Sequence, residues 1–426
     1  MEYININPEY TTLEDWAASE AIQCSLDTPE TFDTAVDRII ASLGESVRLL
    51  GLGEALHGGE EILLLRNRFF QHLVEVHGYR AIAIESSLPR ARIVNEYISG
   101  NGPSSYEAVE HSGFSRGFRG MEGNRQLVEW MRQYNADPSH PVKLRFYGFD
   151  SPTDMTFTES PRKLLDFVIL YLTSIDHNAG QEYRHRIEPL LGVDSDWENP
   201  AAMMDPTKSI GLSPAAAALR IEIEELITDM QIRSPELVAK SDHHRYGEAV
   251  RYASLARQLL TYHAAVARES PWRVSRLLGI RDAMMADNLA YIVFQEQERG
   301  KVLAFAHNSH LKRGSEKWQL GPDLCTWWMA GAHLTMMLGS RYAVIGSGIG
   351  ISETQGIGKP EPGTLEALLT AVSGPVRFIP THSGQGLPPG IVDLPVRSRS
   401  VKNSTYFPLT SQWCTDFDWL AVFDLT

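Results

Sequence analysis

The sequence contains few cysteines and no long apolar run. Its three cysteines, Cys24, Cys325 and Cys414, lie far apart in the chain. An odd number at this spacing argues against a disulfide framework and a cysteine-based metal site, and it is typical of a reducing compartment. No apolar run approaches the roughly 18 residues that are needed to cross a bilayer, so we expect no membrane-spanning helix.

Basic side chains are also scarce relative to acidic ones. The chain has 39 Lys and Arg against 53 Asp and Glu, which gives a formal net charge of −14. Nucleic acids and anionic membranes bind clustered Lys and Arg, so we expect neither as a partner. Residues 1–7 have neither the basic start nor the apolar core of a signal peptide. We therefore expect a cytoplasmic protein whose partner is a small molecule.

Two apolar runs in opposite halves of the chain end in titratable side chains. The first begins at Val47 and ends in Gly53-Glu54-Ala55-Leu56-His57-Gly58, and the second begins at Val302 and ends in Ala306-His307-Asn308-Ser309-His310. Each run is typical of a buried strand. Ligands of open α/β sheets bind just outside the carboxyl ends of such strands. The two motifs therefore predict an enzyme and indicate where its site lies.

The order of the predicted elements indicates an α/β fold. Apolar runs predict strands at about 47–53, 80–85, 143–150 and 302–307. Helical periodicity between them favours parallel strands, in a mostly parallel central sheet flanked by helices with a large helical insertion or cap. We divide the chain into a first part of the α/β core at 1–154, a helical insertion at 155–299 and a second part of the core at 300–426. Together these parts are expected to form one compact unit.

More specific expectations concern single segments. Amphipathic stripes predict helices at about 30–44, 60–77, 124–135, 237–267 and 271–298. Gly78 is expected to end the second of these helices in the left-handed conformation. Later strands are expected at about 342–347, 376–380 and 418–424, the last of them at an edge of the sheet. Residues 1–28 are polar, and they predict an irregular arm.

Polar side chains at the predicted strand ends form one candidate site. Its members are Glu54, His57, Glu85, Asp150, His307 and His310. A lone histidine is more often structural, and a lone glutamate after a strand is often a helix cap, but these strand ends converge in space. A neutral histidine can take a proton from water near pH 7, and a nearby carboxylate fixes its tautomer. We therefore expect His57 to be a general base that Glu54 or Glu85 orients.

Two further roles follow from the same set. Arg66, in the helix after His57, is a candidate for stabilising an oxyanion or for pinning a carboxylate. Together with one of His307 or His310 it is expected to polarise the substrate carbonyl. The histidines and a glutamate also suit zinc or iron, although the spacing is not that of a helical zinc-protease motif. We predict no cofactor, and a bound metal stays the open alternative.

Three rival motifs are weaker. Gly113 to Gly117 matches the nucleophile-elbow pattern around Ser115, but no hydrophobic strand precedes it. Gly51-x-Gly53 lacks the third glycine of a dinucleotide-binding loop, where Leu56 stands. The stretch Trp327-Trp328-Met329 and the pair Met336-Met337 are apolar enough to line a pocket, although such residues are more often core.

At these residues the chain resembles the erythromycin esterase family. The matching pieces are residues 53–58, 64–66, 84–85, 147–150, 281–288 and 306–310, in family order from about 45 to 315. The terminal segments 1–30 and 350–426 add little to the resemblance. It implies an α/β core with a helical portion and hydrolysis of carboxylic esters, including macrolactones, without a serine nucleophile.

The resemblance also implies residue roles. His57 falls at the family's essential histidine, which is proposed as the general base for water. Glu54, Arg66, Glu85, His307 and His310 fall at its other active-site positions. Metal dependence and the macrolide substrate do not carry over, because neither is uniform in the family.

The predicted function is therefore serine-independent hydrolysis of an ester or lactone, with macrolactone ring opening as one form of it. Two alternatives remain open. One is an acyltransferase or cyclase that uses the same site with a substrate hydroxyl as nucleophile. The other is a haem-binding protein, implied by resemblance to a distantly related iron-regulated family, with His307 or His310 as axial ligand.

Overall fold

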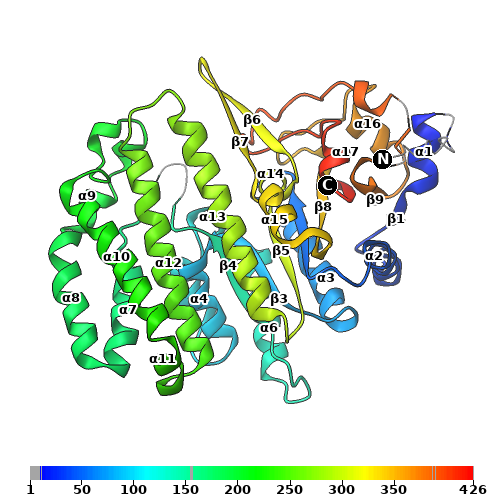
Figure 1. Cartoon of the computed structure of the whole chain (residues 1–426). Coiled ribbons are helices and arrows are strands. Elements are labelled where there is room, and N and C mark those ends of the chain that lie inside the picture. Colours follow the sequence, from blue (N-terminus) through cyan, green and yellow to red (C-terminus); the bar gives the residue numbers. More distant parts are fainter. Residues whose placement is uncertain (1–9, 11, 154–156, 386, 389, 426) are drawn as a thin grey trace, which may run out of the picture.

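A mixed β-sheet forms the centre of the protein (Figure 1). The structure is a computed structural model that describes residues 10, 12–153, 157–385, 387–388 and 390–425. In that part of the chain the sheet has eight strands, in the order β1 (Ile22–Cys24), β9 (Val376–Pro380), β10 (Trp419–Leu425), β8 (Tyr342–Ser352), β2 (Leu49–Glu54), β5 (Lys301–His307), β3 (Tyr79–Ser87) and β4 (Arg145–Asp150). The α/β fold class with a central sheet is confirmed.

Six neighbouring strands of this sheet are parallel. They run from β10 through β8, β2, β5 and β3 to β4, while β9 and β1 pair antiparallel beyond them. All six residues of β2 are buried, as expected where helices cover both faces of a parallel sheet. The sequence predicts β2, a helix and β3 as one parallel unit. The structure inserts β5, from the second half of the chain, between these two strands.

Helices cover both faces. One face carries α2 (Pro29–Leu43), α3 (Glu60–Val76), α4 (Leu88–Ile98), α5 (Tyr106–Gly113) and α6 (Glu122–Ala136), whose apolar residues join one core cluster with the sheet. The other face packs against α1 (Leu13–Glu20), α13 (Arg273–Glu296), α15 (Ala330–Leu338) and α16 (Leu365–Thr370). The helix predicted at 60–77 is α3, and Gly78 follows it with a φ of +73°.

A helical layer lies beyond the β4 edge of the sheet (Figure 1). It contains α7 (Arg162–Ile175), α8 (His177–Leu191), α10 (Pro214–Ile232), α11 (Ser234–Lys240) and α12 (His243–Val266), which have a core cluster of their own. This layer occupies the predicted helical insertion between β4 and β5. The division of the chain into 1–154, 155–299 and 300–426 stays a prediction.

The structure corrects three local predictions and adds one element that was not predicted. The single helix expected at 237–267 is broken, because Asp242 accepts a hydrogen bond from the Arg245 amide and starts α12 anew. The strand expected at an edge, β10, lies inside the sheet, since β9 and β8 flank it. The arm expected at 1–28 contains α1 and β1, and residues 1–9 and 11 lie outside the described residues. A hairpin of β6 (Ser315–Leu320) and β7 (Asp323–Trp328) was not predicted.

Candidate active site

The carboxyl ends of four adjacent strands meet at one cavity. In sheet order, β2 ends in Glu54, β5 in His307, and β4 in Asp150, while Glu85 lies near the end of β3. The cavity has a volume of about 670 Å³. Its titratable lining includes His57, Glu85, Asp150, Arg281, His307 and His310. The strand-end side chains predicted from the sequence therefore do converge.

Much of the remaining wall is apolar. It consists of Phe118, Phe157, Leu278, Trp318, Trp327, Met329 and Phe407. Trp318 and Trp327 belong to the β6–β7 hairpin, which thus forms one side of the cavity. Trp328, the neighbour of Trp327, points outward and is 62% exposed. Of the five residues considered as pocket lining, Trp327 and Met329 line the cavity, whereas Met336 and Met337 are exposed elsewhere.

His57 and Glu54 form a hydrogen-bonded pair at the cavity wall. His57 lies in the turn between β2 and α3, and its Nδ1 is 2.6 Å from Glu54 Oε1. The His57 side chain is 32% exposed, whereas that of Glu54 is 1% exposed. Burial lowers the pKa of His57, but the carboxylates of Glu85 and Glu54 outweigh burial and hold this pKa above 6.5. The pair places one histidine nitrogen against a buried carboxylate and leaves the ring open to the cavity.

A loop near the carboxyl terminus holds the backbone of His57. The His57 amide donates to Thr405 Oγ1 at 2.9 Å, and Asn403 Nδ2 donates to the His57 carbonyl oxygen at 3.0 Å. Thr405 Oγ1 also donates to Asn403 Oδ1 at 2.6 Å. The position of His57 therefore depends on residues far from it in the sequence.

His307 lies beside His57 as a neutral ring. The two ring centroids are 5.3 Å apart. His307 Nε2 donates to the Thr405 carbonyl oxygen at 3.0 Å, and the Ser309 amide donates to His307 Nδ1 at 3.2 Å. Burial lowers the pKa of His307 to about 3. Both ring nitrogens of His307 thus have backbone partners, and burial disfavours its protonated form.

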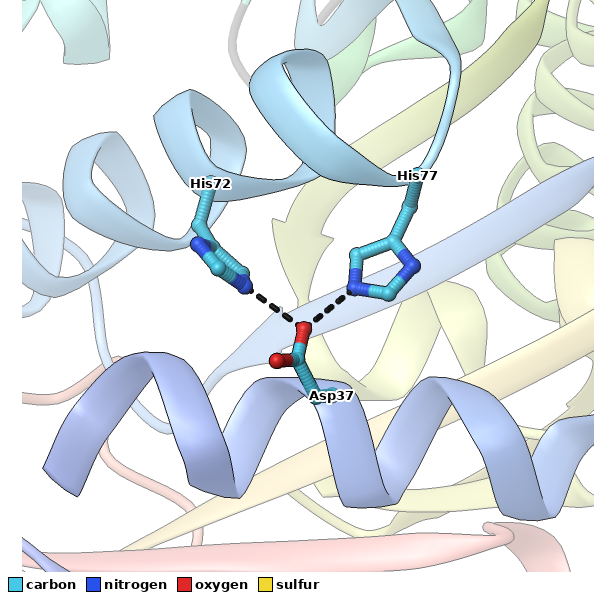
Figure 2. A group of neighbouring side chains, drawn as sticks. All are labelled: Asp37, His72 and His77. Carbon is cyan, nitrogen blue, oxygen red and sulfur yellow. Dashed lines mark hydrogen bonds and ion pairs between the residues drawn. The ribbon is translucent and has the colours of Figure 1, made fainter. Parts of the chain in front are cut away.

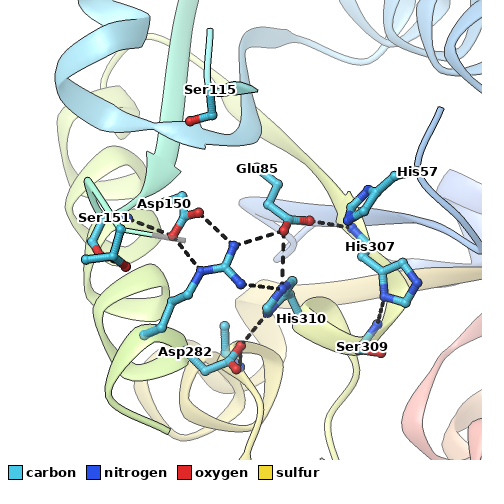
Figure 3. Close-up of polar contacts among 12 residues, drawn as sticks. His57, Glu85, Ser115, Asp150, Ser151, Asp282, His307, Ser309 and His310 are labelled. Carbon is cyan, nitrogen blue, oxygen red and sulfur yellow. Dashed lines mark hydrogen bonds and ion pairs between the residues drawn. The ribbon is translucent and has the colours of Figure 1, made fainter. Parts of the chain in front are cut away.

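His310 is instead held between carboxylates. Its Nδ1 is 2.7 Å from Asp282 Oδ1 and its Nε2 is 3.3 Å from Glu85 Oε1. Burial lowers the pKa of His310, but these two carboxylates outweigh burial and raise it to about 10. Figure 3 shows Glu85 between His310 and the His57–His307 pair. The same Nε2 also lies 3.3 Å from Arg281 Nη1, so His310 is enclosed by two carboxylates and one guanidinium.

Glu85 links the two halves of the site. Its Oε2 accepts from the His307 amide at 2.9 Å, and its Oε1 is 3.1 Å from Arg281 Nη2. Arg281 also pairs with Asp150, with Nη2 at 2.7 Å from Oδ2. Burial raises the pKa of Glu85, but the charges of His310, His57 and Arg281 overcome it and hold this pKa well below 4.5. Glu85 therefore stays ionised, and its negative charge acts on His57.

Arg66 lies behind the site rather than in it. It is fully buried, and it is absent from the cavity lining. Its guanidinium donates to Asn67 Oδ1 at 2.7 Å, to Asn124 Oδ1 at 2.9 Å and to the Gly123 carbonyl oxygen at 3.3 Å. Its charge lowers the pKa of Glu54, although burial dominates and raises that pKa. In this arrangement Arg66 supports Glu54 and does not reach a carbonyl in the cavity.

Two serines of the cavity lining have buried hydroxyls with no partner among the described residues. Ser87 is 2% exposed and Ser309 is 7% exposed, and both line the cavity. Neither Oγ has a hydrogen-bond partner among the residues that the structure describes. An unpaired buried polar group costs free energy, so each such group calls for an explanation, such as a ligand that completes it.

The short helix α14 (Asn308–Leu311), which carries Ser309 and His310, is pinned to the sheet. Asn308 Nδ2 donates to the Ser347 carbonyl oxygen at 2.7 Å, and Asn308 Oδ1 accepts from the Ser347 amide at 2.9 Å. Asn308 packs directly on Gly53, where a Cβ atom would collide with its side-chain amide. The glycine that resembled a dinucleotide-binding motif thus makes room for Asn308.

His307 and His310 do not fit the axial positions of a haem as arranged. Both ring nitrogens of His307 and of His310 already have partners, so an axial bond to iron would break one of these contacts. Among the described residues, one group of three side chains has the spacing of metal ligands, and it is Asp37, His72 and His77, none of which lines the cavity.

Sequence reasoning assigned no role to three residues of the site. Arg281 and Asp282 stand in the 281–288 segment that resembles the family, which was a usable signal for them. Thr405 had none: it belongs to Asn403-Ser404-Thr405, which reads only as a glycosylation acceptor. Its part in the site arises from tertiary structure alone. Ser115, the rival nucleophile, lines the cavity, but its Oγ accepts from the Ser87 amide at 2.9 Å.

The chain has sequence relatives among characterised erythromycin esterases. The chain is similar to erythromycin esterase type II of Escherichia coli, with 22% identity over 311 residues, 70% of this chain and 69% of the relative. It is similar to erythromycin esterase type I of Escherichia coli, with 23% identity over 290 residues and 67% of each chain.

Solved structures of similar proteins show the same fold. A succinoglycan biosynthesis protein superimposes with a TM-score of 0.72 at 20% identity, over 97% of this chain and 96% of its own. A mutant of the erythromycin esterase EreC in its open conformation gives a TM-score of 0.62 at 18% identity, over 91% and 92%. At these identities the likeness concerns the fold alone.

The erythromycin esterase family model matches residues 74–425. The match includes Glu85, His307 and His310, while Glu54, His57 and Arg66 precede it. It also includes the segment 350–426 almost entirely, which corrects the expectation that this segment adds little to the resemblance. Because the matched segment is most of the sequence, the chain belongs to the erythromycin esterase family.

Proposed function

We propose that this chain hydrolyses a carboxylic ester or lactone by direct attack of water, with His57 as the general base. The observation that supports this most is the pair of His57 and Glu54, 2.6 Å apart, at the wall of the cavity. No partner of His57 Nε2 occurs among the described residues, so that nitrogen is available to a water molecule. Relatives named as erythromycin esterases make ester hydrolysis the reaction to expect.

The proposed reaction begins with proton transfer. His57 Nε2 takes a proton from water while the water oxygen attacks the carbonyl carbon and a tetrahedral oxyanion forms. The imidazolium then gives that proton to the leaving alkoxide as the C–O bond breaks. Glu54 holds the Nδ1–H tautomer and stabilises the imidazolium between the two steps. A lactone would open to a hydroxy acid, with a net gain of one water.

The oxyanion needs donors that the protein has not already used. Arg66 is enclosed by other partners, and His307 donates to the Thr405 carbonyl oxygen. The hydroxyls of Ser87 and Ser309 have no partner among the described residues, and Ser309 is the one that precedes His310 in the chain. We assign the carbonyl oxygen to this side of the cavity, with Ser309 as hydrogen-bond donor and His310 as a nearby positive charge.

Cavity size and lining bear on the substrate. A volume of about 670 Å³ with a mostly apolar wall exceeds what a small ester fills and lies within the usual range of ligand sites. This favours a bulky ester or lactone. We propose a macrolactone as the first substrate to test, in keeping with the names of the relatives.

The test compares wild type with His57→Ala on a macrolide and on a simple aryl ester, read by mass spectrometry for a gain of one water. We expect the variant to lose at least about a hundredfold in turnover, since general-base catalysis contributes roughly 10²–10⁴. His185→Ala, an exposed histidine on α8, is the matched control and should keep wild-type turnover. Circular dichroism checks that both variants fold.

Two results would contradict the mechanism. Full turnover in a folded His57→Ala variant removes the general base. A covalent acyl adduct trapped on Ser115 or another side chain replaces water as the nucleophile. Adding an alcohol acceptor separates hydrolysis from acyl transfer, because a transferase would yield the new ester in preference to the acid.

A further inference from the structure

A second polar cluster lies on α2 and α3, outside the cavity. Asp37 comes from α2, His72 from the last turns of α3, and His77 from the residue that ends α3 (Figure 2). The Nε2 atoms of His72 and His77 are each 2.7 Å from Asp37 Oδ1. The two imidazole rings thus converge on one carboxylate oxygen from a neighbouring helix.

This convergence has the chemistry of a transition-metal site. Imidazole nitrogen and carboxylate oxygen are ligands of zinc, and all three ligand atoms lie within 4.8 Å of one another. Zinc bonds of about 2.0–2.1 Å in a tetrahedron place ligand atoms roughly 3.3 Å apart. The present 2.7 Å contacts therefore need to open by only about half an ångström to admit the ion.

The three side chains differ in how exposed they are, and this difference permits the contacts to open. The His72 side chain is 7% exposed and fixed in the α2–α3 interface, whereas that of Asp37 is 49% exposed. His77 lies between them at 18%. The carboxylate can therefore swing outward while the rings stay in place. The exposed side leaves room for a water molecule as fourth ligand.

A second carboxylate stands behind His72. Asp33 Oδ1 is 3.4 Å from His72 Nδ1, the nitrogen that does not face Asp37. Metal-bound histidines usually carry such a carboxylate on the other ring nitrogen, because it fixes the tautomer that directs a lone pair at the metal. Arg68 Nη2 holds Asp33 in turn at 2.6 Å. The cluster thus has an outer layer of support as well as three ligands.

We propose that Asp37, His72 and His77 bind a zinc-type divalent ion that ties α2 to α3, with water completing the coordination. This site is independent of the esterase function. His72 lies twelve residues after Glu60, where α3 begins, and this is about 18 Å along the helix. Since His57 lies just before the start of α3, the ion is far from the active site and would act on stability rather than on catalysis.

The test uses the full chain, freed of metal with a chelator and titrated with Zn²⁺ against a chromophoric competitor. We expect saturable binding of one ion at this cluster and a rise in Tm with added Zn²⁺. His77→Gln should abolish both effects. Asp33→Asn, behind His72, should weaken binding by about tenfold or more. His185→Gln on α8 should change neither.

The cavity histidines require a separate control. If His77→Gln keeps the bound ion and His57→Asn loses it, the metal belongs to the cavity and the proposal fails. If no saturable binding or Tm shift occurs in a folded wild-type protein, the cluster is only a hydrogen-bonded contact between helices, and the proposal fails as well. Circular dichroism of each variant shows whether lost binding reflects lost folding.

Discussion

Thr405 anchors His57 across 348 positions of the sequence, through a 2.9 Å hydrogen bond from the His57 amide to the Thr405 hydroxyl. The same residue accepts a hydrogen bond from His307 through its carbonyl oxygen, at 3.0 Å. One loop thus sets the backbone of one histidine and the ring of the other. The spacing between these rings depends on a segment that belongs to neither motif.

Replacing Thr405 tests this positioning. Thr405→Val keeps the carbonyl oxygen and the side-chain shape but removes the acceptor for the His57 amide. We expect kcat to fall about tenfold or more with a smaller change in KM, because small misplacements of a catalytic group are costly. Thr405→Ser retains the hydroxyl and should restore activity. Equal kinetics of the Val and Ser variants would show that the contact has no positioning role.

Glu54→Gln tests the orientation of the general base. The amide can present its N–H to His57 Nδ1 and thereby favour the wrong tautomer, so we expect a loss of at least about a hundredfold in kcat. Loss of the carboxylate also lowers the pKa of His57, which now lies above 6.5. In wild type, kcat/KM should rise with pH through this pKa as His57 becomes neutral.

In the Glu54→Gln variant the acid limb of the pH profile should move to lower pH. The residual activity of this variant is measured from acid to neutral pH on an aryl ester. An unchanged acid limb would mean that His57 is not the group whose ionisation controls the rate.

Ser309→Ala tests the assigned oxyanion donor. Removing one such donor typically costs about 10²–10³ in kcat, and we expect a loss within or somewhat below this range. Ser347→Ala is the matched control, since its hydroxyl is also buried without a described partner but does not line the cavity. Its contacts with Asn308 use backbone atoms and survive the change. Equal activity of the two variants would remove Ser309 from the mechanism.

His310 should make stability depend on alkaline pH. Its pKa is raised from 6.5 to about 10 in the folded protein, so the folded state holds this proton more tightly than the unfolded state. The resulting stabilisation is complete below about pH 6.5 and is lost as pH rises toward 10. Urea unfolding at pH 7 and pH 10 measures it.

His310→Gln should show a smaller loss of stability between these pH values than wild type. It also leaves Asp282 and Glu85 without their shared partner, and we expect a cost of about 3–5 kcal/mol at pH 7. Comparing how the free energy of unfolding changes with pH in the two proteins removes the contribution of groups that titrate in both. Parallel slopes would indicate that His310 is neutral in the folded state.

The strands of the sheet could be predicted where the local sequence itself is typical of a buried strand. Strands β2, β3, β4 and β5 are apolar runs followed by turn residues, and the structure has each of them within a few positions of the predicted bounds. No helix in the described part of the chain has the length and hydropathy to cross a membrane, as the absence of long apolar runs predicts. Such features depend on local composition and on burial of both sheet faces.

Predictions failed where contacts with other segments of the chain determine the local structure. β10 reads as a terminal strand, but the antiparallel β9 covers its outer side. The hairpin strand β6 has mostly exposed or half-buried side chains, so it lacks the apolar signal of a core strand. The break between α11 and α12 at Ser241 depends on one residue, Asp242, which caps the start of α12 within an otherwise helical pattern. Each of these features depends on pairing or capping that periodicity does not encode.

The site divides in the same way. The sequence by itself determined which side chains end the strands, because a buried run followed by Glu54 and His57, or by His307 and His310, already places titratable groups at the carboxyl edge of a parallel sheet. Only the tertiary structure decided their states. Burial lowers the pKa of His307, the carboxylates of Asp282 and Glu85 raise that of His310, and the surrounding side chains enclose Arg66. Ionisation depends on burial and on charges brought together from distant segments, and no local pattern of residues specifies those distances.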